Sequence, residues 1–242
     1  MMTFSRIYLN PHLRQGRKLL TNPEAMHAAV SAAFPPNLDE SSGRVLWRVD
    51  HHSYNPSLKQ APEHVLYIVA PAKPRLTHIA EQAGWESSED NVTETIADYT
   101  RFLDSLMADQ IWRFELVANP TRSLSQGTGK RGKRVPCVTI GHQTEWLMKQ
   151  APKAGFTFNL DTDDAIAPTV VAKDHLAFPH DDGDRRKWQK LRLTAVRYTG
   201  VLKVTDAEKL RYTLTHGLGR GRAYGCGLMT LAKPREGDGF RE

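Results

Sequence analysis

Long apolar runs are missing from this 242-residue chain. A membrane-spanning helix needs about 20 mostly apolar residues in succession, and polar residues interrupt every apolar run here well before that length. The amino-terminal segment MMTFSRIYLNPHLRQGRKLL indicates a strand followed by a basic loop, and it lacks the apolar core of a secretory signal peptide. We therefore expect a cytoplasmic protein with no membrane partner.

Cysteine is scarce as well. The two cysteines, Cys137 and Cys226, are far apart in the chain and fit none of the short spacings of metal-binding or redox pairs. The segment FPHDDGD places His180 beside three acids. A metal site there is one interpretation and a charged turn is the better one, because no HExxH-like ligand set accompanies it. We expect reduced cysteines, no metal and no cofactor.

Acidic residues are missing from two parts of the chain. The net charge is +6, but residues 1–107 hold 10 basic against 12 acidic residues, so the whole positive excess lies in residues 108–242. No acid occurs between Glu115 and Glu145 or between Glu208 and Glu236. These windows are either solvated basic surfaces or contacts for a polyanion. Their clustering favours the polyanion, because each contacted phosphate releases bound counterions.

The first half of the chain shows a regular order of elements. Residues 4–10, 43–52 and 63–72 have the composition of strands. Residues 21–34 predict a helix, with Asn22 or Thr21 as its cap, Pro23 in its first turn, and an apolar stripe that includes Met26 and Val30. Residues 75–85 indicate a short helix or a turn that leads into a weak strand. The order β-α-β-β-α-β is that of a ferredoxin-like domain.

The same order recurs after a polar and acidic segment, residues 87–100, which we interpret as a linker. The elements that follow are, in order, a strand (110–120), a basic glycine-rich loop (123–136), a helix (142–155), a charged hairpin (178–205), a helix (206–219) with Asp206 as its cap, and a strand (227–233). We therefore predict an α+β protein of two tandem ferredoxin-like domains, residues 1–100 and 101–242.

Five glycines stand in the segment HGLGRGRAYGCGL, residues 216–228. A dinucleotide fingerprint or a phosphate-binding P-loop would follow a strand and open a helix, whereas here the glycines follow a helix and precede a strand. A nucleotide-dependent enzyme therefore finds no support. We expect backbone N–H groups at Gly219 and Gly221, with Arg220 and Arg222, to lie against an extended anion. Tyr224 would either stack on a base or pack on the protein, and packing is favoured.

Three motifs occur together in this order: NPEAMH, ANPTRSLSQGTGKRGKRVP and GLGRGRAYGCGLMTL. In this combination the chain resembles the CasE family of CRISPR-associated repeat-processing endoribonucleases, from the type I-E system. That family belongs to a wider group with tandem ferredoxin-like domains and a carboxy-terminal glycine-rich loop. The resemblance spans nearly the whole chain.

The resemblance implies a definite chemistry. Such enzymes bind one stem-loop of the CRISPR repeat transcript and cut at the 3′ base of the stem without a metal ion. The ribose 2′-hydroxyl attacks the adjacent phosphate and leaves a 2′,3′-cyclic phosphate and a 5′-hydroxyl. The product stays bound, so the expected partners are the crRNA and the other subunits of the Cascade complex. The rival interpretation is a non-catalytic RNA-binding subunit of the same kind of complex.

His27 matches the catalytic histidine of the family. A histidine on the polar face of an Ala-rich helix would otherwise be unremarkable, but the resemblance implies a general acid for the leaving 5′-oxygen. Family members carry a tyrosine three residues earlier, where this chain has Glu24. That carboxylate would either repel the scissile phosphate or orient His27. Three cations are candidates for a second group that stabilises the phosphate: Arg17, Lys18 and Lys133.

The RNA contacts are expected on three basic segments. The resemblance implies phosphate contacts rather than base readout, because A-form stems hide their base edges in a deep major groove. The expected contacts are Lys130, Arg131, Lys133 and Arg134 in the basic loop, Arg185, Arg186, Lys187, Lys190 and Arg192 on the charged hairpin, and Gly219, Arg220, Gly221 and Arg222 in the glycine segment.

Overall fold

The structure is a computed structural model that describes residues 1–52, 63–85, 93–125, 127, 132–160, 167–180 and 189–234. Contacts within the chain divide it into two compact units. Unit 1 is Met1–Ser105 together with Arg222–Gly225, and unit 2 is Leu106–Gly221 together with Cys226–Glu242. The glycine segment therefore contributes residues to both units. No helix in the described part of the chain combines the length and the apolar character that a bilayer crossing requires.

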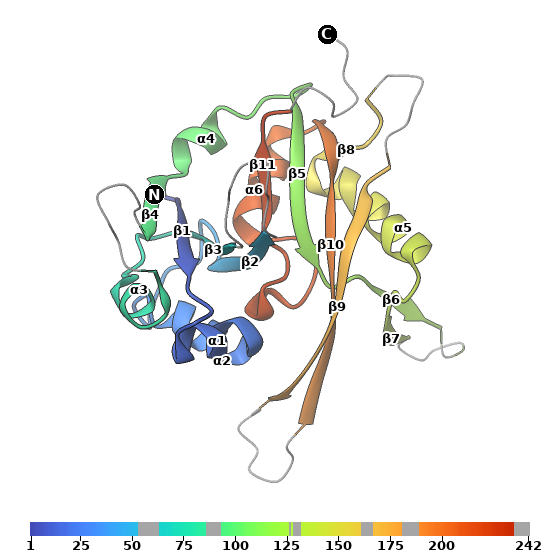
Figure 1. The fold of residues 1–242 in the computed structure, drawn as a ribbon. Coiled ribbons are helices and arrows are strands. Elements are labelled where there is room, and N and C mark those ends of the chain that lie inside the picture. Colours follow the sequence, from blue (N-terminus) through green and yellow to red (C-terminus); the bar gives the residue numbers. More distant parts are fainter. Residues whose placement is uncertain are drawn as a thin grey trace, which may run out of the picture. The chain divides into compact units, whose positions relative to one another are not determined.

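Unit 1 is a four-stranded antiparallel sheet with helices in its connections (Figure 1). Its strands are β1 (Thr3–Leu9), β2 (Leu46–His52), β3 (Glu63–Ala70) and β4 (Glu94–Asp98), and its helices are α1 (Arg14–Thr21), α2 (Pro23–Ser31), α3 (Thr77–Ala83) and α4 (Thr100–Asp104). The strand order is β2-β3-β1-β4. With α1 and α2 between β1 and β2, and α3 between β3 and β4, this is the predicted ferredoxin-like arrangement.

The core of unit 1 lies between the helices and one face of this sheet. Met26 and Val30 of α2 are buried with Leu19 of α1, and all three belong to one apolar cluster with sheet residues such as Ile7 and Trp47. Burial of these side chains is the main favourable contribution to the packing of α2 on the sheet. The stripe predicted for residues 21–34 is therefore confirmed at Met26 and Val30.

Two local predictions in unit 1 are wrong. The segment interpreted as a linker contains β4, which pairs with β1 from Thr3 opposite Asp98 to Ile7 opposite Glu94. This edge strand is mostly exposed or half-buried, so its sequence lacks the apolar alternation of a buried strand. The segment interpreted as a basic loop after β1 contains the helix α1, whose Leu19 is buried in the core of unit 1.

Unit 2 contains the same β-α-β-β-α-β order, with additional short strands inserted in it. Its strands are β5 (Ile111–Ala118), β6 (Thr121–Leu124), β7 (Lys133–Pro136), β8 (Phe156–Thr157), β9 (Thr169–His180), β10 (Gln189–Val204) and β11 (Met229–Ala232), and its helices are α5 (Ile140–Gln150), η2 (Ala151–Ala154) and α6 (Ala207–His216). The main sheet has the order β11-β5-β10-β8, and β9 also pairs with β10. The predicted fold class, two tandem ferredoxin-like domains, is thereby confirmed.

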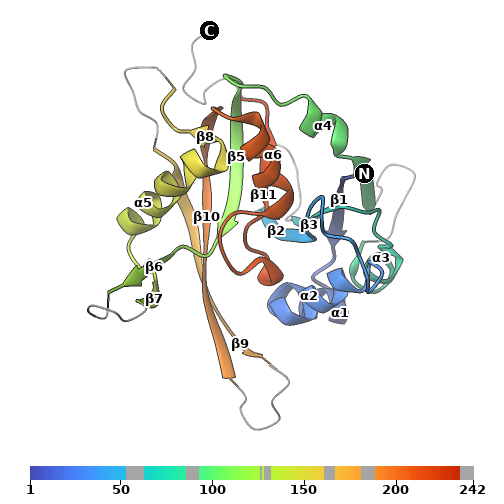
Figure 2. The ribbon, with the colours of Figure 1, turned by 180° about the vertical axis from the view of Figure 1, so that it is seen from behind.

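Two strand pairs extend from the main sheet of unit 2. The predicted charged hairpin is present as β9 and β10, which pair from Gln189 opposite His180 to Thr199 opposite Thr169 and reach well beyond the neighbouring strands (Figure 2). The predicted basic loop is partly wrong, because β6 and β7 form an antiparallel ribbon within it, with Leu124 opposite Lys133. The residues of this short ribbon are mostly polar and exposed, so they show no apolar alternation in the sequence.

Candidate active site

The local sequence around His27 fixes the start and the orientation of α2. The side-chain oxygen of Asn22 accepts hydrogen bonds from the backbone N–H groups of Glu24 (3.0 Å) and Ala25 (3.2 Å). Pro23 occupies the first turn, where its missing N–H costs nothing. Because Met26 faces the core, the next residue, His27, lies on the flank of α2 and is half-buried.

Tyr224 is the aromatic neighbour of His27 within unit 1. Their ring centroids are 6.2 Å apart and the rings are tilted by 58°. Tyr224 lies in η3 (Arg222–Tyr224), one turn of 3-10 helix inside the glycine segment. The sequence left open whether this tyrosine would pack on the protein or stack on a base. In the structure its ring packs beside the helix that carries His27.

Glu24 completes this group, which we call the α2 cluster: Glu24, His27 and Tyr224. Glu24 lies in the first turn of α2, three residues before His27 and therefore on the same side of the helix. Burial, and secondly the nearby Glu24 carboxylate, raise the pKa of Tyr224 above its ordinary value. The cluster thus combines an imidazole, which can transfer a proton near neutral pH, with a phenol that keeps its proton and a carboxylate that accepts hydrogen bonds.

Two of the three cations expected to assist His27 lie on α1. Arg17 and Lys18 are exposed, and the guanidinium group of Arg17 donates a hydrogen bond to the carbonyl oxygen of His12 (2.9 Å). Arg17 is therefore engaged with the loop before α1. The third, Lys133, lies on β7 of unit 2 and is exposed.

The basic residues expected to bind RNA are only partly described. Lys133 and Arg134 are exposed on β7, and Arg192 is exposed on β10, opposite Ala177. Lys190 lies on β10 opposite Pro179. Lys130, Arg131, Arg185, Arg186 and Lys187 lie outside the described residues, as do the acids that follow His180. The described members of the basic loop and of the charged hairpin thus lie on antiparallel strand pairs of unit 2.

The glycine segment joins α6 to β11, as predicted, and its backbone conformation depends on its glycines. Gly219 has a φ of +85° and Gly221 a φ of +81°, a region that favours glycine. Arg220 is exposed and forms an isolated bridge with Asn119. The carbonyl oxygen of Gly221 accepts a hydrogen bond from the N–H of Cys226 (3.2 Å). Arg222, in contrast, is half-buried in η3.

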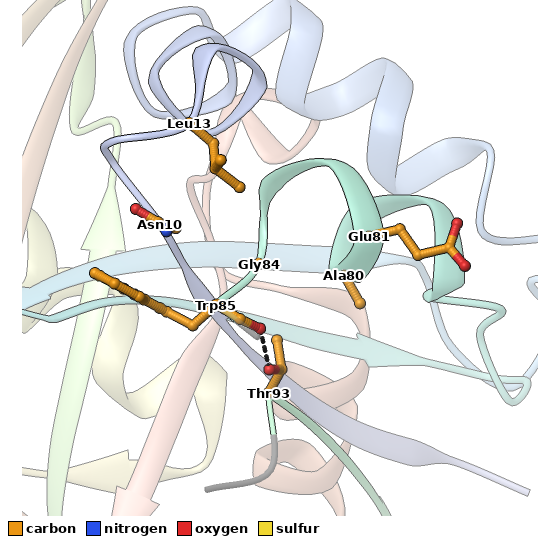
Figure 3. A pocket seen from close by; sticks show the side chains of 7 residues that line it. All are labelled: Asn10, Leu13, Ala80, Glu81, Gly84, Trp85 and Thr93. Atoms are coloured by element: carbon orange, nitrogen blue, oxygen red, sulfur yellow. Dashed lines mark hydrogen bonds between the residues drawn. The ribbon is translucent and has the colours of Figure 1, made fainter. Parts of the chain in front are cut away.

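A pocket of about 620 Å³ lies elsewhere in unit 1 (Figure 3). Side chains from the segment after β1, from α3 and from the segments on either side of residues 86–92 line it, among them Asn10, Leu13, Ala80, Glu81, Trp85 and Thr93. The hydroxyl of Thr93 donates a hydrogen bond to the carbonyl oxygen of Trp85 at its edge. None of the described residues that line this pocket is a site residue predicted from the sequence.

The similarity to known proteins extends over almost the whole chain. A CRISPR-associated endoribonuclease Cse3 of Thermus thermophilus is 27% identical over 231 residues, which cover 96% of this chain and 100% of that protein. A solved structure of a CRISPR endoribonuclease Cse3 bound to 19 nt RNA superposes with a TM-score of 0.73 at 28% identity, covering 96% of this chain and 99% of that one.

The fold is shared more widely. A chain in a pre-nicking structure of a CRISPR RNA-guided surveillance complex matches with a TM-score of 0.58 at 20% identity, covering 95% of this chain and all of that one. The family model described as "CRISPR associated protein" matches residues 2–233. This match agrees with the order of motifs in the sequence and with the two ferredoxin-like units. The chain therefore belongs to the family of CRISPR associated proteins.

Proposed function

We propose that this chain is an endoribonuclease that cuts CRISPR precursor RNA at the 3′ base of the repeat stem-loop and stays bound to the crRNA as a Cascade subunit. The observation that carries the proposal is the α2 cluster. A half-buried histidine lies on α2, which Asn22 caps, and the relative Cse3 is named an endoribonuclease. Cse3 has also been solved bound to RNA.

The proposed reaction is a transesterification followed by product retention. The ribose 2′-oxygen forms a bond to the adjacent phosphorus and loses its proton to solvent, while the bond from phosphorus to the 5′-oxygen breaks. The imidazolium of His27 donates its Nε2 or Nδ1 proton to that leaving oxygen. The products are a 2′,3′-cyclic phosphate and a 5′-hydroxyl. General acid catalysis of this kind contributes about 10²–10⁴-fold in rate, and the scheme requires no metal ion.

Exposed cations of unit 2 would supply the affinity for RNA. Lys133 and Arg134 on β7, Arg192 on β10 and Arg220 in the glycine segment are exposed and can approach phosphates. Contacts of this kind fix the register of a stem without reading its bases. Lys133 remains a proposed second group at the phosphate, together with Arg17 and Lys18.

The deciding experiment uses the repeat RNA from the organism's own CRISPR array, labelled at its 5′ end. The wild-type chain is expected to cut it once, in EDTA, and to leave a cyclic phosphate on the upstream fragment. His27→Ala is expected to abolish cleavage while the dissociation constant for the stem-loop stays within about threefold. A 2′-deoxy nucleotide on the 5′ side of the cut is expected to block the reaction. Loss of activity in EDTA, or cleavage by His27→Ala at a comparable rate, would overturn the mechanism.

Glu24 supports one alternative, a non-catalytic RNA-binding subunit. Glu24 lies in the first turn of α2, where the family that the sequence resembles carries a tyrosine, and its carboxylate would repel the scissile phosphate. The same assay separates the two functions, because a purely binding subunit would bind the labelled stem-loop and return it uncut.

A further inference from the structure

Tyr224 is held in place by a turn that glycine makes possible. The one-turn helix η3 is followed directly by Gly225, whose φ is +78°. Gly225 is buried, and a Cβ atom there would lie 2.7 Å from Cζ3 of Trp47. Trp47 is itself buried in the core of unit 1. The backbone that follows Tyr224 therefore lies directly on the buried indole ring of Trp47. This contact fixes the backbone position from which the Tyr224 side chain extends.

The phenol ring then meets the imidazole of His27. The centroid separation of 6.2 Å and the tilt of 58° are within the range of favourable aromatic pairs. A histidine on the flank of a helix has two free torsions, and only some of its orientations aim a ring nitrogen at a given point. A half-buried aromatic neighbour reduces the number of those orientations. The ring of Tyr224 is in position to do so.

The chemistry of Tyr224 excludes the role of a general base. Burial and the Glu24 carboxylate both raise the pKa of the phenol above its ordinary value. The hydroxyl therefore keeps its proton at neutral pH and cannot accept one from a ribose. The remaining contributions of Tyr224 are the contact made by its ring and the hydrogen bond that its hydroxyl can donate.

We propose that Tyr224 is a positioning residue for His27, acting through its ring, which holds the imidazole in the orientation that delivers a proton to the leaving oxygen. This inference rests on the proposed function. The glycine segment then has a second role besides contact with RNA. It holds an aromatic ring against α2, the helix that carries the general acid. Because a displacement of about 1 Å can cost about 100-fold in rate, loss of the ring should slow the chemical step.

The test measures the single-turnover cleavage rate at saturating protein, together with the dissociation constant for a non-cleavable 2′-deoxy stem-loop. Tyr224→Ala is expected to cut about 10–100-fold more slowly with affinity within about threefold of wild type. Tyr224→Phe keeps the ring and is expected to cut within about threefold of the wild-type rate. Tyr212→Ala removes a tyrosine of α6 that is 64% exposed and serves as the matched control, with wild-type behaviour expected.

Two outcomes overturn the inference. If Tyr224→Ala cuts at the wild-type rate, the ring does not position His27. If Tyr224→Phe is as slow as Tyr224→Ala, the hydroxyl acts rather than the ring. Thermal melting checks folding, and if Tyr224→Ala is unfolded, Tyr224→Leu decides in its place, since it fills the space without a ring. A different result contradicts the proposed function itself, namely that the wild-type chain yields no cyclic-phosphate product.

Discussion

Gly225 and the indole ring of Trp47 are in such close contact that no side chain fits between them. A Cβ atom at Gly225 would lie 2.7 Å from Cζ3 and 3.1 Å from Cη2 of Trp47. The positive φ of Gly225, +78°, is independently unfavourable for any other residue. Two separate requirements, space and backbone conformation, therefore select glycine at this position.

Gly225→Ala should consequently damage both the fold and the site. The indole lies in a close-packed core and cannot retreat without strain, so we expect a loss of about 1–3 kcal/mol in the free energy of unfolding. Displacement of the adjacent Tyr224 should also slow cleavage by about tenfold or more. Urea unfolding and single-turnover cleavage measure the two effects.

Gly141→Ala is the matched control for this prediction. Gly141 lies in α5, and a Cβ atom there would meet open space. Alanine is favoured over glycine in a helix by about 1 kcal/mol, so this variant should be at least as stable as wild type and equally active. If Gly225→Ala matches it in stability and activity, the contact with Trp47 has no energetic consequence.

Lys133 and Arg134 should contribute to RNA binding through their charge. Both are exposed on β7, and each phosphate contact contributes about 0.7–0.9 to the slope of log K against log salt concentration. We expect each alanine variant to weaken stem-loop binding uniformly across repeat sequences. Each variant should also reduce the magnitude of that slope by about 0.7–0.9, the contribution of one phosphate contact. Equilibrium binding at several salt concentrations measures the slope.

Lys149→Ala controls for a general loss of positive charge. The ammonium of Lys149 pairs with Glu145 one helical turn away on α5, so its removal should leave the slope unchanged. An equal reduction in Lys149→Ala would mean that net charge, rather than β7, determines the affinity.

The fold could be predicted from the sequence where local signals and burial agree. Asn22 and Pro23 mark the start of α2, and the structure confirms both the cap and the buried stripe behind it. Asp206 similarly caps α6, where its carboxylate accepts a hydrogen bond from the N–H of Lys209 (3.1 Å). Such features depend on residues three or four positions apart, which the sequence displays directly.

The sequence could not predict features that depend on distant residues. The strand β4 forms because β1 offers it an open edge, and its own residues are too exposed to show a pattern. The proximity of Tyr224 to His27 joins residues almost two hundred positions apart. Glycine spacing indicated a special backbone in this segment, but nothing local indicates that the turn would lie on Trp47.

Cys226 connects the glycine segment to the pH dependence of stability. It is fully buried, and burial raises the pKa of its thiol from 9.0 to about 12. The folded chain therefore holds this proton more tightly than the unfolded chain does. The resulting stabilisation is complete below about pH 9 and is lost as the pH rises from 9 towards 12, by at most about 1.4 kcal/mol per pH unit.

Comparison of wild type with Cys226→Ala isolates this contribution, because other buried groups titrate equally in both. The free energy of unfolding of wild type should fall more steeply between pH 9 and pH 11 than that of the variant. Alkylation by iodoacetamide at pH 8 gives a second measurement, since the thiolate is the reactive species. Cys226 should react only after denaturant is added. Rapid alkylation of Cys226 in the native chain, or parallel pH profiles, would mean that the segment around Cys226 opens in solution.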